Sequence, residues 1–72
     1  MATLDEINHL YNKSIMWVDR AKKLRKLADD KNYDIIKQTR FMALAATQML
    51  RAREALQKAN ELINENLNAN NN

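Results

Sequence analysis

Apolar side chains recur at three- and four-residue steps along the first part of the chain. The main row consists of Ile7, Leu10, Ser14, Trp17, Ala21, Leu24 and Ala28, with Leu4, Tyr11 and Val18 beside it. This period places the apolar positions on one face of an α-helix. Thr3 followed by Glu6 has the spacing of a capping box, in which the threonine hydroxyl accepts from the Glu6 N–H. The pattern predicts a helix over about residues 4–28.

A seven-residue repeat follows in the second half of the chain. Large apolar residues occupy one position of the repeat and alanines another: Ile35, Met42, Met49, Leu56 and Ile63, with Ala45, Ala52 and Ala59 between them. Large side chains at one position and alanine at the other allow two helices to approach closely. We therefore predict a second helix over about residues 33–67. It should pack against the first through the face of Met42, Ala45 and Met49.

The segment Asp29-Asp30-Lys31-Asn32 interrupts the helical pattern. Asp and Asn are poor in helix interiors and good at helix N-termini, because their side chains bind nearby backbone N–H groups. We predict a turn at residues 29–32, with Asp30 or Asn32 capping the second helix and Asp34 in its first turn. One continuous helix through residue 67 is the alternative, since the chain has no glycine or proline to force a turn.

The composition agrees with an all-α fold. The chain has 72 residues, contains no glycine, proline or cysteine, and is rich in strong helix formers. We predict a single two-helix antiparallel hairpin, similar to a coiled coil, over residues 1–67. The asparagine-rich residues 68–72 have little to bury and are predicted to form a disordered tail. Without cysteine there is no disulfide framework, which indicates a reducing compartment such as the cytoplasm.

The charge of the chain is concentrated in its middle. Residues 13–53 carry eleven Lys and Arg against four Asp and Glu, a net charge of +7, while both ends are acidic. A cluster of five basic residues could neutralise phosphates: Arg20, Lys22, Lys23, Arg25 and Lys26. A small basic nucleic-acid-binding regulator is therefore one alternative. We favour a solvated face or an acidic protein partner, because the cluster spreads around the helix and no aromatic residues are interleaved with it.

The sequence offers little catalytic chemistry. His9 lies one turn after Asp5, but a metal site needs three or four ligands and no others converge on this pair. Ser14 has no base beside it, and its hydroxyl is expected to bond back to the Leu10 carbonyl. We predict no enzymatic activity, no cofactor and no metal. The acidic start is unlike a signal peptide, and no apolar run predicts membrane insertion.

The chain has more apolar surface than one helix pair can bury. The last ten or so residues of the second helix should extend beyond the first helix, and other apolar positions point away from the predicted contact face. Such surfaces usually mark protein interfaces. The predicted partner-binding residues are Ile15, Met16, Ile36, Ala43, Leu44, Leu50, Leu62 and Ile63. A second copy of the chain is the alternative occupant, which would make the protein a self-assembling coiled-coil adaptor.

Three features together resemble a known family: the start Leu4-Asp5-Glu6, the turn Asp29-Asp30-Lys31-Asn32 leading into Tyr33, and the alanine-rich second helix ending in Leu62-Ile63. Over residues 3–67 the chain resembles the small co-chaperones of type III secretion needle subunits. The resemblance implies that the hairpin pairs with a larger helical-repeat chaperone. Together, the two proteins would hold the needle subunit soluble in the bacterial cytoplasm. Needle subunits are also short helical hairpins, so a needle-like structural subunit is a further alternative.

Overall fold

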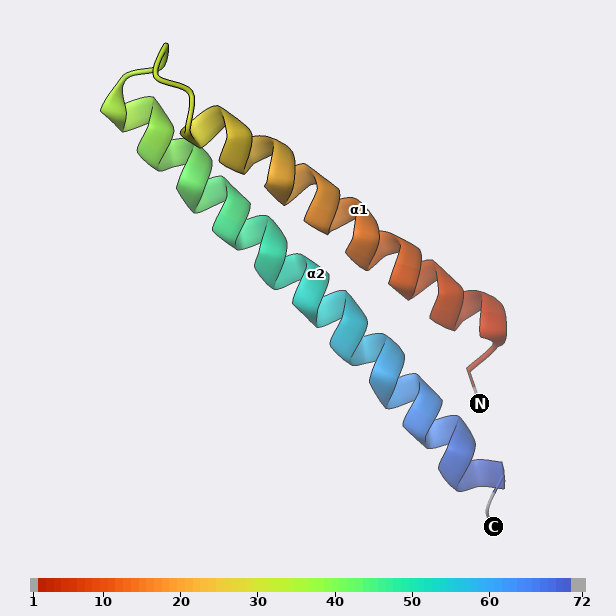
Figure 1. Cartoon of the computed structure of the whole chain (residues 1–72). Helices are drawn as coiled ribbons and strands as arrows, with labels where there is room; N and C mark the ends of the chain where they lie inside the picture. The colour runs from red at the N-terminus through yellow and green to blue at the C-terminus, as the bar shows by residue number, and fades with distance from the viewer. Residues whose placement is uncertain (1, 71–72) are drawn as a thin grey trace.

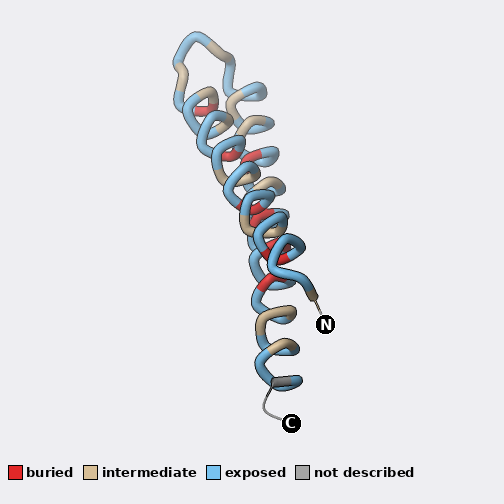
Figure 2. The backbone as a smooth tube through the Cα atoms, turned by 90° about the vertical axis from the view of Figure 1, so that its right-hand side faces the viewer, coloured by how far each residue is buried: buried red, intermediate tan, exposed pale blue. Residues whose placement is uncertain are grey.

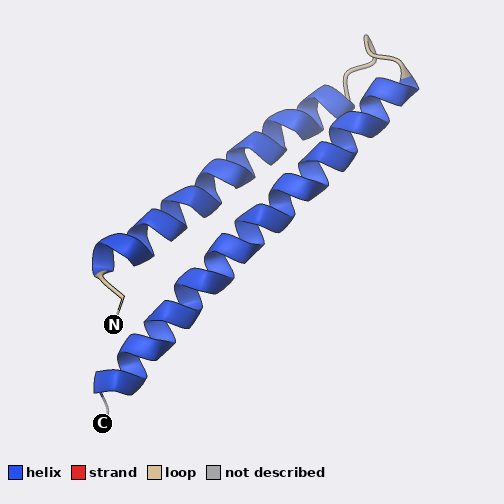
Figure 3. Ribbon diagram, turned by 180° about the vertical axis from the view of Figure 1, so that it is seen from behind, coloured by secondary structure: helices blue, strands red, loops and turns tan. Residues whose placement is uncertain are grey.

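Two antiparallel helices make up the fold. The structure is a computed structural model that describes residues 2–70, apart from the Asn70 side chain. Helix α1 spans Leu4–Ala28 and helix α2 spans Ile35–Asn70. The chain reverses between them, so that both termini lie at one end and the connecting loop at the other (Figures 1 and 3). The predicted all-α hairpin is thereby confirmed, and the alternative of one continuous helix is wrong.

Helix α1 begins as its sequence predicts. Thr3 has an extended backbone, and its Oγ1 accepts from the Glu6 N–H at 3.1 Å. Asp5 and Glu6 lie in the first turn and Arg25 lies in the last, so the charges at both ends oppose the helix dipole. The helix ends where the Asp29 N–H donates to the Arg25 carbonyl at 3.1 Å.

The turn is longer than predicted and is capped by a different residue. Asp34 Oδ1 accepts from the Lys37 N–H at 2.8 Å, so Asp34 is the N-cap of α2 and the predicted caps Asp30 and Asn32 are wrong. The helix begins at Ile35, where a start at about residue 33 was predicted. Asp30 is engaged within the turn instead. Its Oδ1 accepts from the Asn32 N–H at 2.9 Å, and its carbonyl accepts from Gln38 Nε2 at 2.8 Å. A carboxylate that closes the turn cannot also cap the helix that follows.

Small side chains form the contact between the helices. Every buried residue of α1 is seven positions from the next: Ile7, Ser14, Ala21 and Ala28. Those of α2 are all alanines: Ala45, Ala52, Ala55 and Ala59. Figure 2 shows these buried positions between the two helices. We call Ser14, Ala21 and Ala28 together with Ala45, Ala52 and Ala59 the small-residue seam. Among the described residues, no large side chain is fully buried.

The predicted contact face of α2 is therefore only partly right. Ala45 is 1% exposed, but Met42 and Met49 are 51% and 38% exposed. Alanines draw the two backbones together, and the neighbouring row of larger side chains is then forced to the side of the contact instead of into it. The close approach that the alanines predict places the methionines outside the core.

The register of the hairpin also differs from the prediction. The Ala2 N–H donates to Asn66 Oδ1 at 3.1 Å and Asn66 Nδ2 donates to the Ala2 carbonyl at 2.9 Å, so the start of the chain lies beside residue 66. Ala59 is 0% exposed, and the expected overhang over this part of α2 is wrong. The first turns of α2 instead project past the end of α1, toward the loop (Figure 1).

The molecule is a thin rod. Its Cα atoms extend over 58 × 15 × 11 Å with a radius of gyration of 16.7 Å, against roughly 11 Å expected for a compact domain of this length. Two helices side by side expose most of their surface, so the large apolar side chains of the described residues, other than Ile7, are all at least partly exposed. Helix α2 continues beyond residue 67 to Asn70. Residues 71 and 72 lie outside the described residues, and the disorder of the tail stays a prediction.

Candidate protein-binding surface

An exposed apolar surface, interrupted by Thr39 and Arg53, runs along the first two thirds of α2. It is formed by two rows of exposed side chains at seven-residue steps. One row is Ile35, Met42, Met49 and Leu56, the other is Ile36, Ala43 and Leu50, and Ala46 lies between the rows. We call this set the methionine strip. At 100° per residue its members cover about 160° of the helix surface, and from Ile35 to Leu56 it extends about 32 Å. Its largest side chains are well exposed, with Ile35 at 77% and Leu50 at 53%.

The strip adjoins α1 through two shallow hollows. The first, of about 230 Å³, brings Ser14 and Val18 of α1 together with Met49, Ala52, Arg53 and Leu56. The second, of about 470 Å³, lies between Arg25 of α1 and the residues Ala46, Met49, Leu50 and Arg53 of α2. Each hollow is lined by apolar side chains together with arginine. Neither is lined by a carboxylate.

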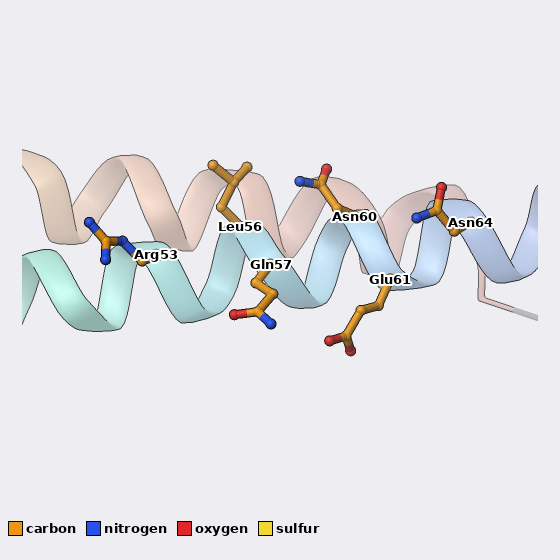
Figure 4. A pocket seen from close by; sticks show the side chains of 6 residues that line it. All are labelled: Arg53, Leu56, Gln57, Asn60, Glu61 and Asn64. Atoms are coloured by element: carbon orange, nitrogen blue, oxygen red, sulfur yellow. The ribbon is translucent and has the colours of Figure 1, made fainter.

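The strip ends in a polar region at Leu56. Beyond it, the outer face of α2 carries amide and carboxylate side chains, and Figure 4 shows this region: Arg53, Leu56, Gln57, Asn60, Glu61 and Asn64. Tyr11 Oη donates to Asn60 Oδ1 at 3.3 Å, so polar contacts join the helices here. A hollow lined by one helix and by amides has few groups to hold an apolar ligand. The candidate surface is therefore confined to residues 35–56.

The opposite flank of the hairpin is better covered. Its large side chains, at the positions next to the seam on the other side, are all half-buried: Leu10, Trp17, Leu24, Phe41 and Leu62. The guanidinium carbons of Arg20 and Arg51 lie 5.0 and 4.9 Å from the Trp17 ring centroid. Near the loop, the Tyr33 and Phe41 rings meet edge to face at 5.1 Å. We call this the tryptophan flank.

The eight predicted partner-binding residues do not form one surface. Ile36, Ala43 and Leu50 belong to the methionine strip. Leu44 lies near the loop with Tyr33, Lys37, Arg40 and Phe41. Met16 lies with His9, Asn12 and Lys13, and Ile15 is 57% exposed on α1. Leu62 and Ile63 are half-buried.

The sequence prediction missed Ile35, Met42, Met49 and Leu56 as surface residues, because their regular repeat was assigned to the core. A signal that could have found them is present in α1. Its own row at the same period contains Ser14, Ala21 and Ala28, which are as small as the alanines of α2. Two rows of small residues predict a contact between small rows, and this leaves the large row of α2 beside the contact.

The groups considered for chemistry have structural surroundings. Ser14 is buried, and its Oγ donates to the Tyr11 carbonyl at 2.7 Å instead of the predicted Leu10 carbonyl. His9 is exposed. Within residues 2–70, no three His, Asp or Glu side chains gather as metal ligands. The five residues of the basic cluster are all exposed on α1.

Over the described residues, neither helix combines the length and apolar character needed to cross a bilayer. No family model, no curated protein and no solved structure matches the chain.

Proposed function

We propose that this protein is a non-enzymatic binding subunit whose methionine strip docks onto a helical protein partner. The observation that carries the proposal is an exposed apolar surface about 32 Å long on a hairpin whose buried contact consists almost entirely of small residues. Apolar patches of this extent on a small soluble domain usually mark interfaces. Methionine is suited to such a surface because its flexible thioether adapts to the shape of a partner.

A helix is the partner geometry that suits the strip. The strip is about 160° wide at 100° per residue and as long as a helix of about 21 residues. It also lies beside a row from α1, so an added helix would contact both helices and complete a three-helix arrangement. The resemblance to the co-chaperones of type III secretion needle subunits suggests a larger helical-repeat chaperone as this partner. Cytoplasmic action in a bacterium, with the needle subunit held through that chaperone, is part of the same proposal.

Aspartate substitutions can test the proposed face against a matched control. Met42→Asp with Leu50→Asp places two carboxylates on the strip, whereas Leu44→Asp places one at an equally exposed leucine outside it. Affinity capture from the native host, quantified by mass spectrometry and repeated with purified components, should lose the partner only with the strip variant. Circular dichroism should show unchanged helicity for both variants. Loss with Leu44→Asp alone, or binding that survives the strip variant, would place the interface elsewhere.

Self-assembly through the same strip is the principal alternative. Light scattering across concentration decides it, since a dimer that dissociates on dilution and is abolished by Met42→Asp would make the second copy the occupant. A chain that stays monomeric at high concentration and captures no protein would overturn both proposals.

One contact supports the alternative of nucleic-acid binding. The structure brings Arg51 of α2 to the same indole as Arg20, so an aromatic ring does lie beside the basic cluster. Trp17 is the sole tryptophan, and its fluorescence can report binding of a single-stranded oligonucleotide. Phosphate-driven binding is strongest at low salt, so no fluorescence change at ~50 mM salt would eliminate this function.

A further inference from the structure

Two arginines from different helices line the second hollow, which shares Met49 and Arg53 with the first. Arg25 lies in the last turn of α1 and Arg53 in the middle of α2, and both line the hollow with Ala46, Met49 and Leu50. Arg53 also lines the neighbouring hollow with Val18 and Leu56. Arg25 thus lies on α1 beside the strip and Arg53 lies among the strip's own side chains, and we call this pair the charge border.

Carboxylates that could neutralise this border are absent from both linings. Within the described residues, the structure has one ion pair, between Lys58 and Glu61 at 3.9 Å, and it involves neither arginine. Glu54, one turn after Leu50, lines neither hollow. The two guanidinium groups are thus placed to meet negative charge from outside the chain.

We infer that the partner of the methionine strip is an amphipathic helix with acidic side chains beside its apolar row. This inference rests on the proposed function and specifies the chemistry of its partner. The apolar row would lie on Met42, Met49 and Leu50, while a carboxylate beside that row would meet Arg25 or Arg53. Guanidinium groups pair with carboxylates through two parallel hydrogen bonds, which fixes the register of the added helix.

The charge border also argues against a second copy in this place. In a two-fold symmetric pair the same patch is used by both copies, so Arg25 and Arg53 of both copies would lie in one interface to which the two hollows contribute no carboxylate. Like charges brought together at an interface oppose association. An acidic helix experiences attraction at the same positions.

Two synthetic peptides of about 21 residues can test the inference on the full chain. Both carry the same apolar row of Leu and Ala, and they differ only in having Glu or Lys at the positions that flank it. Calorimetry at ~50 mM salt should give about tenfold tighter binding of the Glu peptide. Raising the salt to ~500 mM should reduce that preference, since exposed charges are then screened.

Charge-reversed chains provide the decisive comparison. Arg25→Glu with Arg53→Glu should invert the preference toward the Lys peptide, and Arg25→Gln with Arg53→Gln should remove the preference without adding acidic charge near the end of α1. Lys23→Glu with Lys31→Glu changes the net charge equally at exposed positions outside both hollows and should keep the Glu preference.

Each remaining outcome is informative. Equal binding of both peptides, abolished by Met42→Asp with Leu50→Asp, would overturn the charge selection and leave the proposed helix-binding function standing. Binding that ignores the strip substitutions would overturn both. If neither peptide binds at about 100 µM, the acidic-helix inference fails, and a concentration-dependent dimer under those conditions would assign the strip to a second copy.

Discussion

The two flanks of this hairpin have similar apolar content and very different coverage. On the tryptophan flank, Leu10, Trp17 and Leu24 of α1 lie beside Phe41 and Leu62 of α2, and all are half-buried. On the other flank, α2 contributes the methionine strip, whereas α1 contributes Val18 as the apolar side chain that reaches the hollows. A large side chain is covered where both helices supply large neighbours and remains exposed where one helix does.

The difference follows from the close seam. When alanines and a serine bring the backbones together, larger residues on either side must interlock across the contact or point into solvent. Trp17 is large enough to reach α2, where Arg51 stacks on it at 4.9 Å. Met42 lines neither of the two hollows shared with α1 and is 51% exposed. One flank therefore contributes to stability, and the other is available for binding.

The largest expected effect tests the seam that creates the two flanks. Ala52→Leu inserts a branched side chain at a position that is 4% exposed and should lower the free energy of unfolding by about 2–3 kcal/mol. Thermal unfolding followed by circular dichroism should show a melting temperature lower by roughly 10 °C or more. Ala46→Leu makes the same change on the exposed strip and should cost nothing measurable. Equal destabilisation by both variants would mean that the seam is not closely packed.

Truncation of one large side chain on each flank compares them directly. Trp17→Ala should destabilise the hairpin by about 2 kcal/mol, below the usual cost for a fully buried tryptophan because this ring is half-exposed. Met42→Ala removes a side chain that is 51% exposed and should change stability by less than about 0.5 kcal/mol. Urea unfolding curves for the two variants measure the difference. A Met42→Ala cost as large as that of Trp17→Ala would show that the strip is part of the core.

A smaller effect is expected at Gln48, which lies in the same seven-residue row as the half-buried Phe41 and Leu62. Gln48 Oε1 is buried without a hydrogen-bond partner. Gln48→Met keeps a similar volume and removes an unsatisfied acceptor, so stability should rise by about 1 kcal/mol. Differential scanning calorimetry at fixed protein concentration checks this gain. A decrease would indicate that the amide is satisfied in solution.

The smallest expected effect separates two arginines. Arg51→Gln removes the guanidinium group from Trp17 and should cost about 0.5–1 kcal/mol. Arg53→Gln changes a residue that borders the strip and should leave unfolding unaffected. Chemical denaturation of both variants, with Trp17 fluorescence as the probe, measures the contrast. Identical midpoints would remove the cation–π contact from the description of the tryptophan flank.

The sequence by itself predicts most of the secondary structure. The α1 stripe, the Thr3 cap and the reversal after Ala28 all follow from local rules, because capping and helical periodicity depend on residues within a few positions of each other. The exception is the start of α2. Asp30, Asn32 and Asp34 are all good caps, and the choice among them depends on which carboxylate the turn itself uses.

The periodicity of α2 alone does not decide which of its rows is buried, and only the tertiary structure decides how far the helices overlap. Both the alanine row and the methionine row repeat every seven residues, so periodicity cannot distinguish them; their contacts with Ser14, Ala21 and Ala28 of α1 can. The register is likewise set by pairing across the hairpin, where Ala2 meets Asn66. The candidate site followed the same logic. Its apolar residues could be identified in the sequence. Only the arrangement of the two helices side by side shows that they form one strip with Arg25 and Arg53 next to it.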